Sequence, residues 1–327
     1  MKIWYNLFMK IRILSDLHLD VNDNYCFKIP KEQQDVFTVI AGDTSGDPDM
    51  TIDWLKKNVK RGVFISGNHL VYNDKEKTIQ ELREQLASAF PKDADITYLD
   101  NEVGVISKEV DGVLFVGSCL YTDFKLPCTW RGKACNDQQI NMSTSWRMMN
   151  DYRWGIKEHS LDSISRDVHI TPEDYLEWFE KAFTTIQDLV EANERLANPK
   201  PIVIVTHHAP LKGCISGYYV NDDANASYAS DLEWFIKKHP SIKCWIYGHI
   251  HNDQKEIDVM RDDGTKCIVI NNARGYCPRV EDRNFNANTF IDTDTWEIEK
   301  TPLSKSHEDK MKKRSDEYLR AMAPFIF

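Results

Sequence analysis

Near its N-terminus the chain contains the stretch IRILSDLH, residues 11–18. Its first four residues are mostly apolar and β-branched, which predicts a short buried strand, and polar residues follow at once. Asp16 and His18 stand two positions apart, so on an extended segment both side chains project to the same side and can meet at one metal ion. A single Asp-x-His pair is weak evidence, because such pairs are also typical of ordinary polar surface.

Four later apolar runs end in the same way, in Gly, Asp, Asn or His. They are residues 36–40 before Gly42-Asp43, residues 63–65 before Gly67-Asn68-His69, residues 202–206 before His207-His208, and residues 244–247 before Gly248-His249-Ile250-His251. Each cluster alone also suits a turn or a structural histidine pair. The last is the most specific, because two imidazoles two residues apart after a glycine are a metal-ligand arrangement. Strand ends in a layered sheet fold share one crevice, so we expect the five clusters to meet there, with ligand types that suit hard to borderline metal ions.

Hairpins and helices complete the prediction of an α/β fold in which two sheets pack together with helices outside. The Asp-Gly dipeptides at residues 111–112 and 263–264 each separate two β-branched runs, which predicts two hairpins. Apolar residues at helical spacing predict a helix over residues 79–90. Thr171-Pro172, with an acid at position 174, predicts the start of another.

The chain divides into one main domain, residues 9–300, and a polar C-terminal tail, residues 301–327. Residues 121–170 fit the strand and helix pattern poorly, and we expect them to form an insertion or cap. Met9-Lys10 repeats the Met-Lys at the start of the chain, so residues 1–8 are an accessory extension if Met9 is the true first residue.

Composition sets broad limits on partners and location. With 41 basic and 51 acidic residues the net charge is −10, which is unfavourable for binding duplex nucleic acid. No stretch approaches the ~18 apolar residues of a membrane helix, so no membrane partner is expected. The eight cysteines include no CxxC pair, which predicts reduced thiols in a cytoplasmic protein. The oligomeric state is left open.

In order, the clusters DLH, GD, GNH, HH and GHIH resemble the motif set of the calcineurin-like metallophosphoesterase family, over residues 10 to about 280. The resemblance implies a two-sheet β-sandwich flanked by helices, an αββα arrangement. It also implies two metal ions. Carried over by position, the ligands are Asp16, His18, Asp43 and His251 for the first, and Asp43, Asn68, His207 and His249 for the second.

The same resemblance implies a mechanism. Asp43 bridges two divalent or trivalent ions (Mn, Fe, Zn, Ni or Co), and a metal-bridging hydroxide attacks a phosphomonoester or phosphodiester in line. His69 lies near the leaving group as a general acid. His208, Arg274 and Tyr276 are candidate substrate-binding residues, His208 alternatively supporting the ligands from behind.

Further stretches, MNDY at 149–152, YASD at 228–231 and NARGY at 272–276, look like a bacterial and phage subgroup of the family. Protein serine/threonine phosphatases of the superfamily carry an Arg shortly after the second Asp motif and an acid after GNH. Here the residues are Thr44-Ser45-Gly46 and Leu70, so a phosphoprotein substrate is not expected.

Residues 121–160 contain six basic and four acidic residues, a net charge of +2, and six aromatic residues. These rings are Tyr121, Phe124, Trp130, Trp146, Tyr152 and Trp154. One interpretation is that they anchor the insertion onto the core. The other is a cap whose rings stack a base, which predicts a small phosphoester or nucleotide-type substrate.

Three alternatives stay open at this point. A nuclease of the same superfamily, acting on single-stranded ends, differs only in substrate. A non-catalytic scaffold with this fold would be expected to lack ligands, and all seven positions are filled. A single-zinc amidohydrolase or peptidase would be expected to contain HExxH, which is absent.

Overall fold

The computed structural model describes residues 9–21, 27–72, 76–130, 133–160, 167–219, 222–251, 256–276 and 285–301. For residues 128–130 and 133–135 only the backbone is described. Residues 1–8, Arg131, and residues 302–327 of the predicted tail therefore lie outside the described part of the chain.

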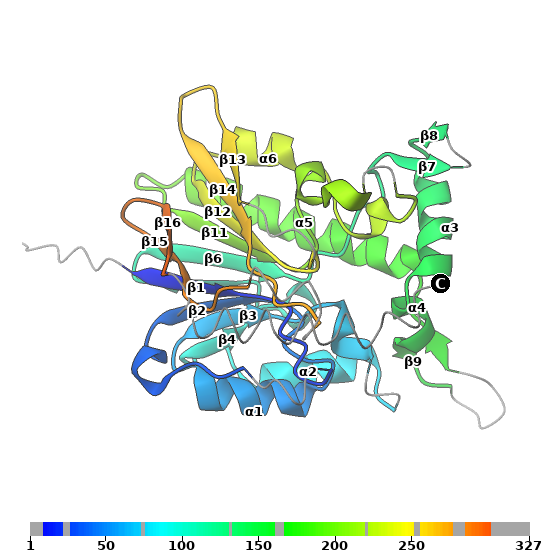
Figure 1. The fold of residues 1–327 in the computed structure, drawn as a ribbon, viewed down its shortest axis with the longest axis horizontal. Coiled ribbons are helices and arrows are strands. Elements are labelled where there is room, and N and C mark those ends of the chain that lie inside the picture. The colour runs from blue at the N-terminus through cyan, green and yellow to red at the C-terminus, as the bar shows by residue number, and fades with distance from the viewer. Residues whose placement is uncertain are drawn as a thin grey trace, which may run out of the picture.

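Two six-stranded mixed sheets pack face to face, which confirms the predicted fold class (Figure 1). The first sheet has the order β16-β15-β1-β2-β3-β4. Its strands are β1 Lys10–Leu14, β2 Phe37–Ala41, β3 Gly62–Ile65, β4 Ile96–Tyr98, β15 Thr289–Asp292 and β16 Glu297–Lys300. β1 to β4 run parallel, and β15 and β16 are antiparallel.

The second sheet has the order β13-β14-β12-β11-β6-β5. Its strands are β5 Ser107–Val110, β6 Val113–Ser118, β11 Ile202–Thr206, β12 Ile242–Tyr247, β13 Glu256–Met260 and β14 Lys266–Asn271. The antiparallel pairs β5–β6 and β13–β14 are the two predicted hairpins. The four strands β6, β11, β12 and β14 are parallel.

Helices cover the outer faces of both sheets, because their apolar stripes need a partner. α1 Pro48–Asn58 and α2 Ile79–Ala89 pack on the first sheet, and α5 Pro172–Glu194 and α6 Glu233–Lys238 pack on the second (Figure 1). The predicted helices are α2 and α5, and each begins with a capping box, at Thr78 and Thr171. None of the described helices is both long and apolar enough to cross a bilayer.

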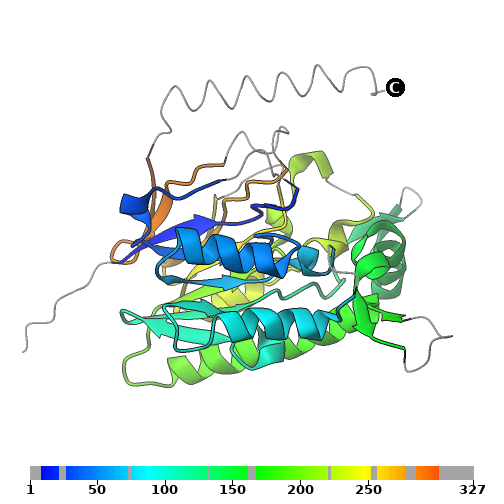
Figure 2. The same cartoon turned by 90° about the horizontal axis from the view of Figure 1, so that it is seen from below.

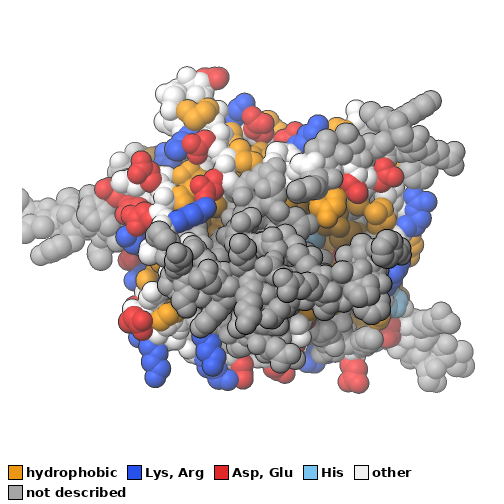
Figure 3. Space-filling model, viewed as in Figure 1, with side chains coloured by type: hydrophobic (Ala, Val, Ile, Leu, Met, Phe, Trp, Pro, Cys, Tyr) orange, Lys and Arg blue, Asp and Glu red, His pale blue; other side chains and the backbone are white. Residues whose placement is uncertain are grey.

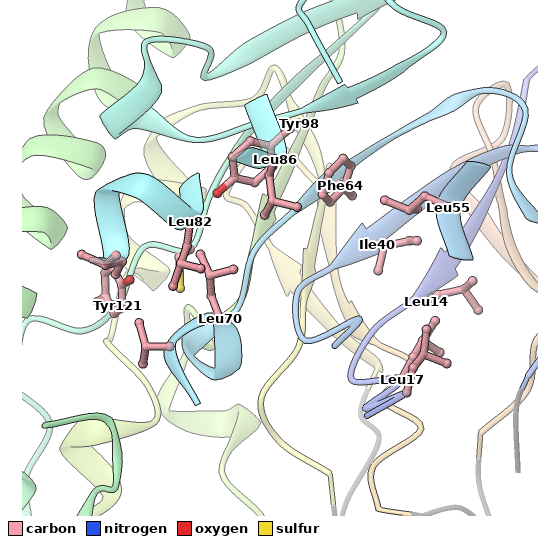
Figure 4. Close-up of a cluster of buried hydrophobic side chains, with 14 of the residues drawn as sticks. Leu14, Leu17, Ile40, Leu55, Phe64, Leu70, Leu82, Leu86, Tyr98 and Tyr121 are labelled. Carbon is pink, nitrogen blue, oxygen red and sulfur yellow. The ribbon is translucent and has the colours of Figure 1, made fainter. Parts of the chain in front are cut away.

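Side-chain alternation along the strands divides the core into layers. Ile11 and Ile13 of β1 and Val39 of β2 face the second sheet in the inter-sheet core. Their neighbours on the opposite face, such as Ile40 and Phe64, pack under α1 and α2 instead. Figure 4 shows this outer cluster, with Leu86 of α2 lying beside Tyr98 and Phe64, and Leu82 of α2 between Leu86 and Leu70.

The described parts of residues 121–170 lie at one end of the sandwich, as Figures 1 and 2 show. Their elements are β7 Cys128–Trp130, β8 Lys133–Cys135, α3 Gln138–Met148, α4 Asp151–Trp154, β9 Ile156–Glu158 and β10 Val168–His169. Short 3-10 helices are η2 Lys31–Gln33, η3 Asn68–Val71, η4 Asn101–Val103, η5 Lys212–Cys214, η6 Gly217–Tyr219 and η7 Asn225–Ser227. We call residues 121–170 the cap.

Candidate metal centre

All five clusters follow the carboxyl ends of parallel strands, β1, β2 and β3 in one sheet and β11 and β12 in the other. Backbone hydrogen bonds tie the loops together: Asp16 N donates to Gly42 O at 3.0 Å, and Gly248 N to His207 O at 3.0 Å. The expectation that the clusters share one crevice therefore matches the geometry.

The predicted ligand atoms converge, with four of the pairs within 3.2 Å. The closest pairs are Asn68 Oδ1–His207 Nε2 at 2.9 Å, Asp16 Oδ1–His251 Nε2 at 3.1 Å, Asp43 Oδ2–His207 Nε2 at 3.2 Å, His18 Nε2–His251 Nε2 at 3.2 Å, and Asp43 Oδ2–His18 Nε2 at 3.9 Å. Three overlapping groups of His and Asp have ligand atoms within 4.8 Å of one another: Asp16–His18–His251, His18–Asp43–His69 and Asp43–His207–His249.

The local backbone is strained where the ligands sit. Asp16, His18, Asp43 and His249 have φ values of 53°, 43°, 49° and 67°, in the left-handed region that L residues avoid. Such conformations cost on the order of 1–3 kcal/mol each and persist where the surrounding structure enforces them, commonly at functional sites.

Close approach explains two of the motif glycines. A Cβ on Gly67 would lie 1.9 Å from Asp43 Oδ1. Gly42 combines a φ of 91° with a Cβ position 2.3 Å from His207 Nδ1. Any side chain at either position would displace a ligand.

Burial and mutual charge set the protonation of the ligands. Burial lowers the pKa of His18 and His249 well below the ordinary imidazole value, so both rings are neutral, the form that binds metal. Burial also acts on Asp43 and His207, but there their attraction outweighs it. The pKa of the Asp43 carboxyl is held well below its usual range, and the pKa of His207 is raised to about 9.

The donor set fits a cation. His207 Nδ1 faces the carbonyl of Ala41 at 2.9 Å, while its Nε2 faces the oxygens of Asn68 and Asp43. A proton on Nε2 and a metal ion are alternatives at that position. The buried Nε2 of His249 has no hydrogen-bond partner among the described residues, as expected of a ligand atom.

A pocket of about 460 Å³ opens over this centre. Five of the site residues line its floor: Asp43, Asn68, His69, His249 and His251. Cap residues 148–150 and residues of the segment 215–228 line other parts of it, with the Tyr228 ring 4.9 Å from that of His249.

His69 is held between two tyrosines at the pocket wall. Its ring centroid lies 4.0 Å from that of Tyr72, and the Oη of Tyr276 lies 3.1 Å from its Nε2. The same Nε2 is 4.0 Å from Asp43 Oδ2. His69 thus adjoins the ligand cluster and lines the pocket.

The three candidate substrate residues are placed differently. Tyr276 lines the pocket. His208 is buried behind His249, ring centroids 4.5 Å apart, with Nδ1 3.4 Å from Cys119 O, because adjacent residues after a strand face opposite ways. Arg274 is also buried, with its guanidinium 6.0 Å from the Phe27 ring centre. The geometry therefore favours direct substrate contact only for Tyr276.

The described aromatic side chains of the cap are either buried in the core or exposed to solvent. Tyr121, Phe124 and Tyr152 are buried in the core, which agrees with an anchoring role. Trp146 and Trp154 are exposed by 46% and 39%, and neither is among the described residues that line the pocket. The Trp130 side chain lies outside the described residues.

Asp151 is a site residue that the sequence did not reveal as one. Asn68 Nδ2 donates to its Oδ1 at 2.6 Å, and Tyr72 Oη donates to the same atom at 3.0 Å. Because Nδ2 is bound there, the Asn68 oxygen is turned toward the ligand cluster. Burial raises the pKa of the Asp151 carboxyl. The only sequence signal was its position in the stretch MNDY, which named no partner.

The layered fold and the strand-end centre define a metal-dependent phosphoesterase. Residues 9–253 match the sequence model of the calcineurin-like phosphoesterase family, and the chain belongs to this family. It is thus a metallophosphoesterase, as the motifs predicted.

One protein is similar to this chain in sequence and one solved structure is similar in fold. An uncharacterised protein, L509, of Acanthamoeba polyphaga mimivirus is 26% identical over 306 residues, which cover 87% of this chain and 96% of L509. The crystal structure of phosphopantetheinyl hydrolase (PptH) from Mycobacterium tuberculosis superposes with a TM-score of 0.58 at 16% identity, covering 83% of this chain and 91% of that one. At this identity the likeness to PptH shows the fold.

Proposed function

We propose that the chain is a dinuclear hydrolase of small phosphoesters, with the ligand assignment that the motifs imply. The observation that supports it is the position of Asp43 between two ligand groups. Its Oδ2 lies 3.2 Å from His207 Nε2 on one side and 3.9 Å from His18 Nε2 on the other. Asp16 and His251 complete the first group, and Asn68 and His249 complete the second.

Charge supports a phosphoryl substrate. Two divalent cations held here would be offset only in part by the carboxylates of Asp16 and Asp43, so the centre would attract an anionic phosphoryl group and lower the pKa of bound water. The imidazole and amide ligands add no charge. An acidic protein with a net charge of −10 thus gains a locally positive floor.

In this proposal His69 donates a proton to the departing oxygen. It lines the pocket next to the ligand cluster, and its ring is held by contacts with Tyr72 and Tyr276. General acid catalysis of this kind contributes about 10²–10⁴-fold.

A small substrate is supported by the pocket, whose volume of about 460 Å³ lies in the range for small-molecule sites. The structural neighbour is named a phosphopantetheinyl hydrolase, which is consistent with an organic group on one phosphoryl.

The test is a panel of phosphomonoesters, phosphodiesters and single-stranded oligonucleotides, assayed with Mn, Fe, Co, Ni or Zn. We expect two ions per chain by elemental analysis after reconstitution, and hydrolysis of small esters that chelator abolishes. One ion or none under excess metal would contradict the dinuclear assignment. Faster cleavage of oligonucleotide ends than of any small ester would favour the nuclease.

A further inference from the structure

Beside the metal centre, one end of the pocket is mostly apolar. Its described apolar and aromatic side chains are Met148, Met149, Ile215 and Tyr219, together with Ile250 and Tyr228 next to the ligands, the Tyr228 ring lying 4.9 Å from that of His249. Two segments supply most of them, the end of α3 and residues 215–228. We call this end the organic pocket.

Two of these side chains are exposed at the rim, Met148 by 53% and Tyr219 by 46%. Large apolar side chains left exposed around a cavity are typical of ligand sites. Methionine adapts its shape to different partners. Figure 3 shows a group of hydrophobic side chains on the cap side of this face.

The polar groups of the organic pocket do not suit a second anion. Asn150, Ser216 and Asn225 are neutral, and Asp222 is the one charged side chain among the described residues at this end. Its Oδ1 accepts a hydrogen bond from Ala224 N at 2.8 Å, which fixes the carboxylate in place. A phosphate or carboxylate bound nearby would meet a negative charge.

Two described arginines of the cap make their hydrogen bonds within the cap. Arg147 donates to Thr144 Oγ1 at 3.4 Å, and Arg153 donates to the carbonyl of Arg147 at 3.2 Å. Neither is among the described residues that line the pocket, so neither is placed to hold a second phosphate there.

We infer that the organic pocket binds an uncharged, apolar alkyl or aromatic group carried by a single phosphoryl group. This inference rests on the proposed function, since it places phosphorus over the metal floor. On this inference the organic group contacts Met148, Tyr219 and Tyr228, and the cap tryptophans do not stack on it. Nucleoside polyphosphates are then not the preferred substrates.

Three alkyl phosphates with alcohols of similar basicity test it: ethyl, 2-phenylethyl and 2-carboxyethyl phosphate. We expect kcat/KM for the phenylethyl ester to exceed that for the ethyl ester at least about tenfold. The difference should lie in a lower KM, because the phenyl group fills the apolar pocket. The carboxyethyl ester should fall below the ethyl ester, and Asp222→Asn should narrow that gap.

Tyr219→Ala and Met148→Ala should each reduce the phenylethyl-to-ethyl ratio severalfold. The matched controls are Trp146→Ala and Trp154→Ala, which remove exposed rings from the same cap and should leave the ratio unchanged. If the phenylethyl-to-ethyl ratio of kcat/KM fell in Trp146→Ala or Trp154→Ala but not in Tyr219→Ala or Met148→Ala, the inference would be wrong.

Binding provides a readout that does not depend on turnover. The phosphonates with the same three groups should show the same order of Kd by calorimetry on the metal-loaded protein. Equal Kd values, or equal kcat/KM values, would overturn the inference while leaving phosphoester hydrolysis intact. Selective phosphonate binding without hydrolysis of any ester would instead contradict the proposed function alone.

Discussion

The metal floor and the cap meet at one pocket but are built in opposite ways. The floor consists of short loops after neighbouring strands, cross-linked by backbone hydrogen bonds, with five of the seven proposed ligands buried. The cap is a separate set of short elements that leaves Trp146, Met148 and Trp154 exposed. The sheets therefore fix the chemistry, and the cap shapes access to it. Asp151 is the exception, because it belongs to the cap and contacts a ligand.

The largest effect is expected in the floor, at Asp43. Asp43→Asn keeps the shape and an oxygen that can still accept from His69 N, which donates to Oδ1 at 3.1 Å, but it removes the charge between the two ligand groups. We expect loss of at least one ion and of activity on the order of 10⁴-fold or more. His18→Ala removes one neutral ligand and should lose less metal. Elemental analysis showing the reverse order would refute the bridging role.

His69→Ala should have the next largest effect, and one that depends on the leaving group. Alkyl phosphates, whose alkoxides need a proton, should slow by about 10²–10⁴-fold, whereas p-nitrophenyl phosphate should slow far less. Metal content should be unchanged, which separates this variant from Asp43→Asn. Equal losses on both esters would leave only a role in positioning Asn68.

Asp151→Asn tests whether the cap takes part in the metal centre. The amide can donate to Asn68 as well as accept from it, so it no longer dictates which end of the Asn68 amide faces the ligands. Removing a group that orients a ligand typically costs about 10–100-fold in metal affinity or activity, and we expect that range for the site of Asn68 and His207.

Asp137→Asn is the matched control. Asp137 is the N-cap of α3 in the same cap, where Asn serves equally well. Titration of metal into both variants by calorimetry makes the comparison. Wild-type affinity in Asp151→Asn would mean that the sheet alone orients Asn68.

The contrast between the metal floor and the cap also explains which features could be predicted from the sequence. Asp16 with His18, and His249 with His251, were recognisable because ligand spacing is local and the sheet brings strand ends together. Helix α5 was recognisable from its Thr171 cap and apolar stripe. Helix α3, by contrast, has the sequence QQINMSTSWRM, in which polar residues lie on all sides, so no stripe marks it.

Individual contacts between residues far apart in the sequence could not be predicted from it. Asp151 contacts Asn68 across 83 residues, and no periodicity or spacing encodes that pairing. The site of His208 depended on which way the chain turns after β11. The organic pocket depends on how the end of α3 meets residues 215–228, which is a matter of tertiary packing alone.

The smallest effect is expected for Ser145→Ala, which tests the cap as structure. Ser145 Oγ and Tyr152 Oη are buried and lie 2.9 Å apart, one turn of α3 from the pocket-lining Met148 and Met149. Losing this hydrogen bond leaves the Tyr152 hydroxyl buried without that partner, which costs about 1–3 kcal/mol of stability. We expect a melting temperature a few degrees lower, measured by calorimetry, with metal affinity unchanged. Asp151→Asn should show the opposite pattern, a weakened metal site with a smaller change in melting temperature. If Ser145→Ala also weakened metal binding, the packing of the whole cap, rather than the one carboxylate, would support the centre.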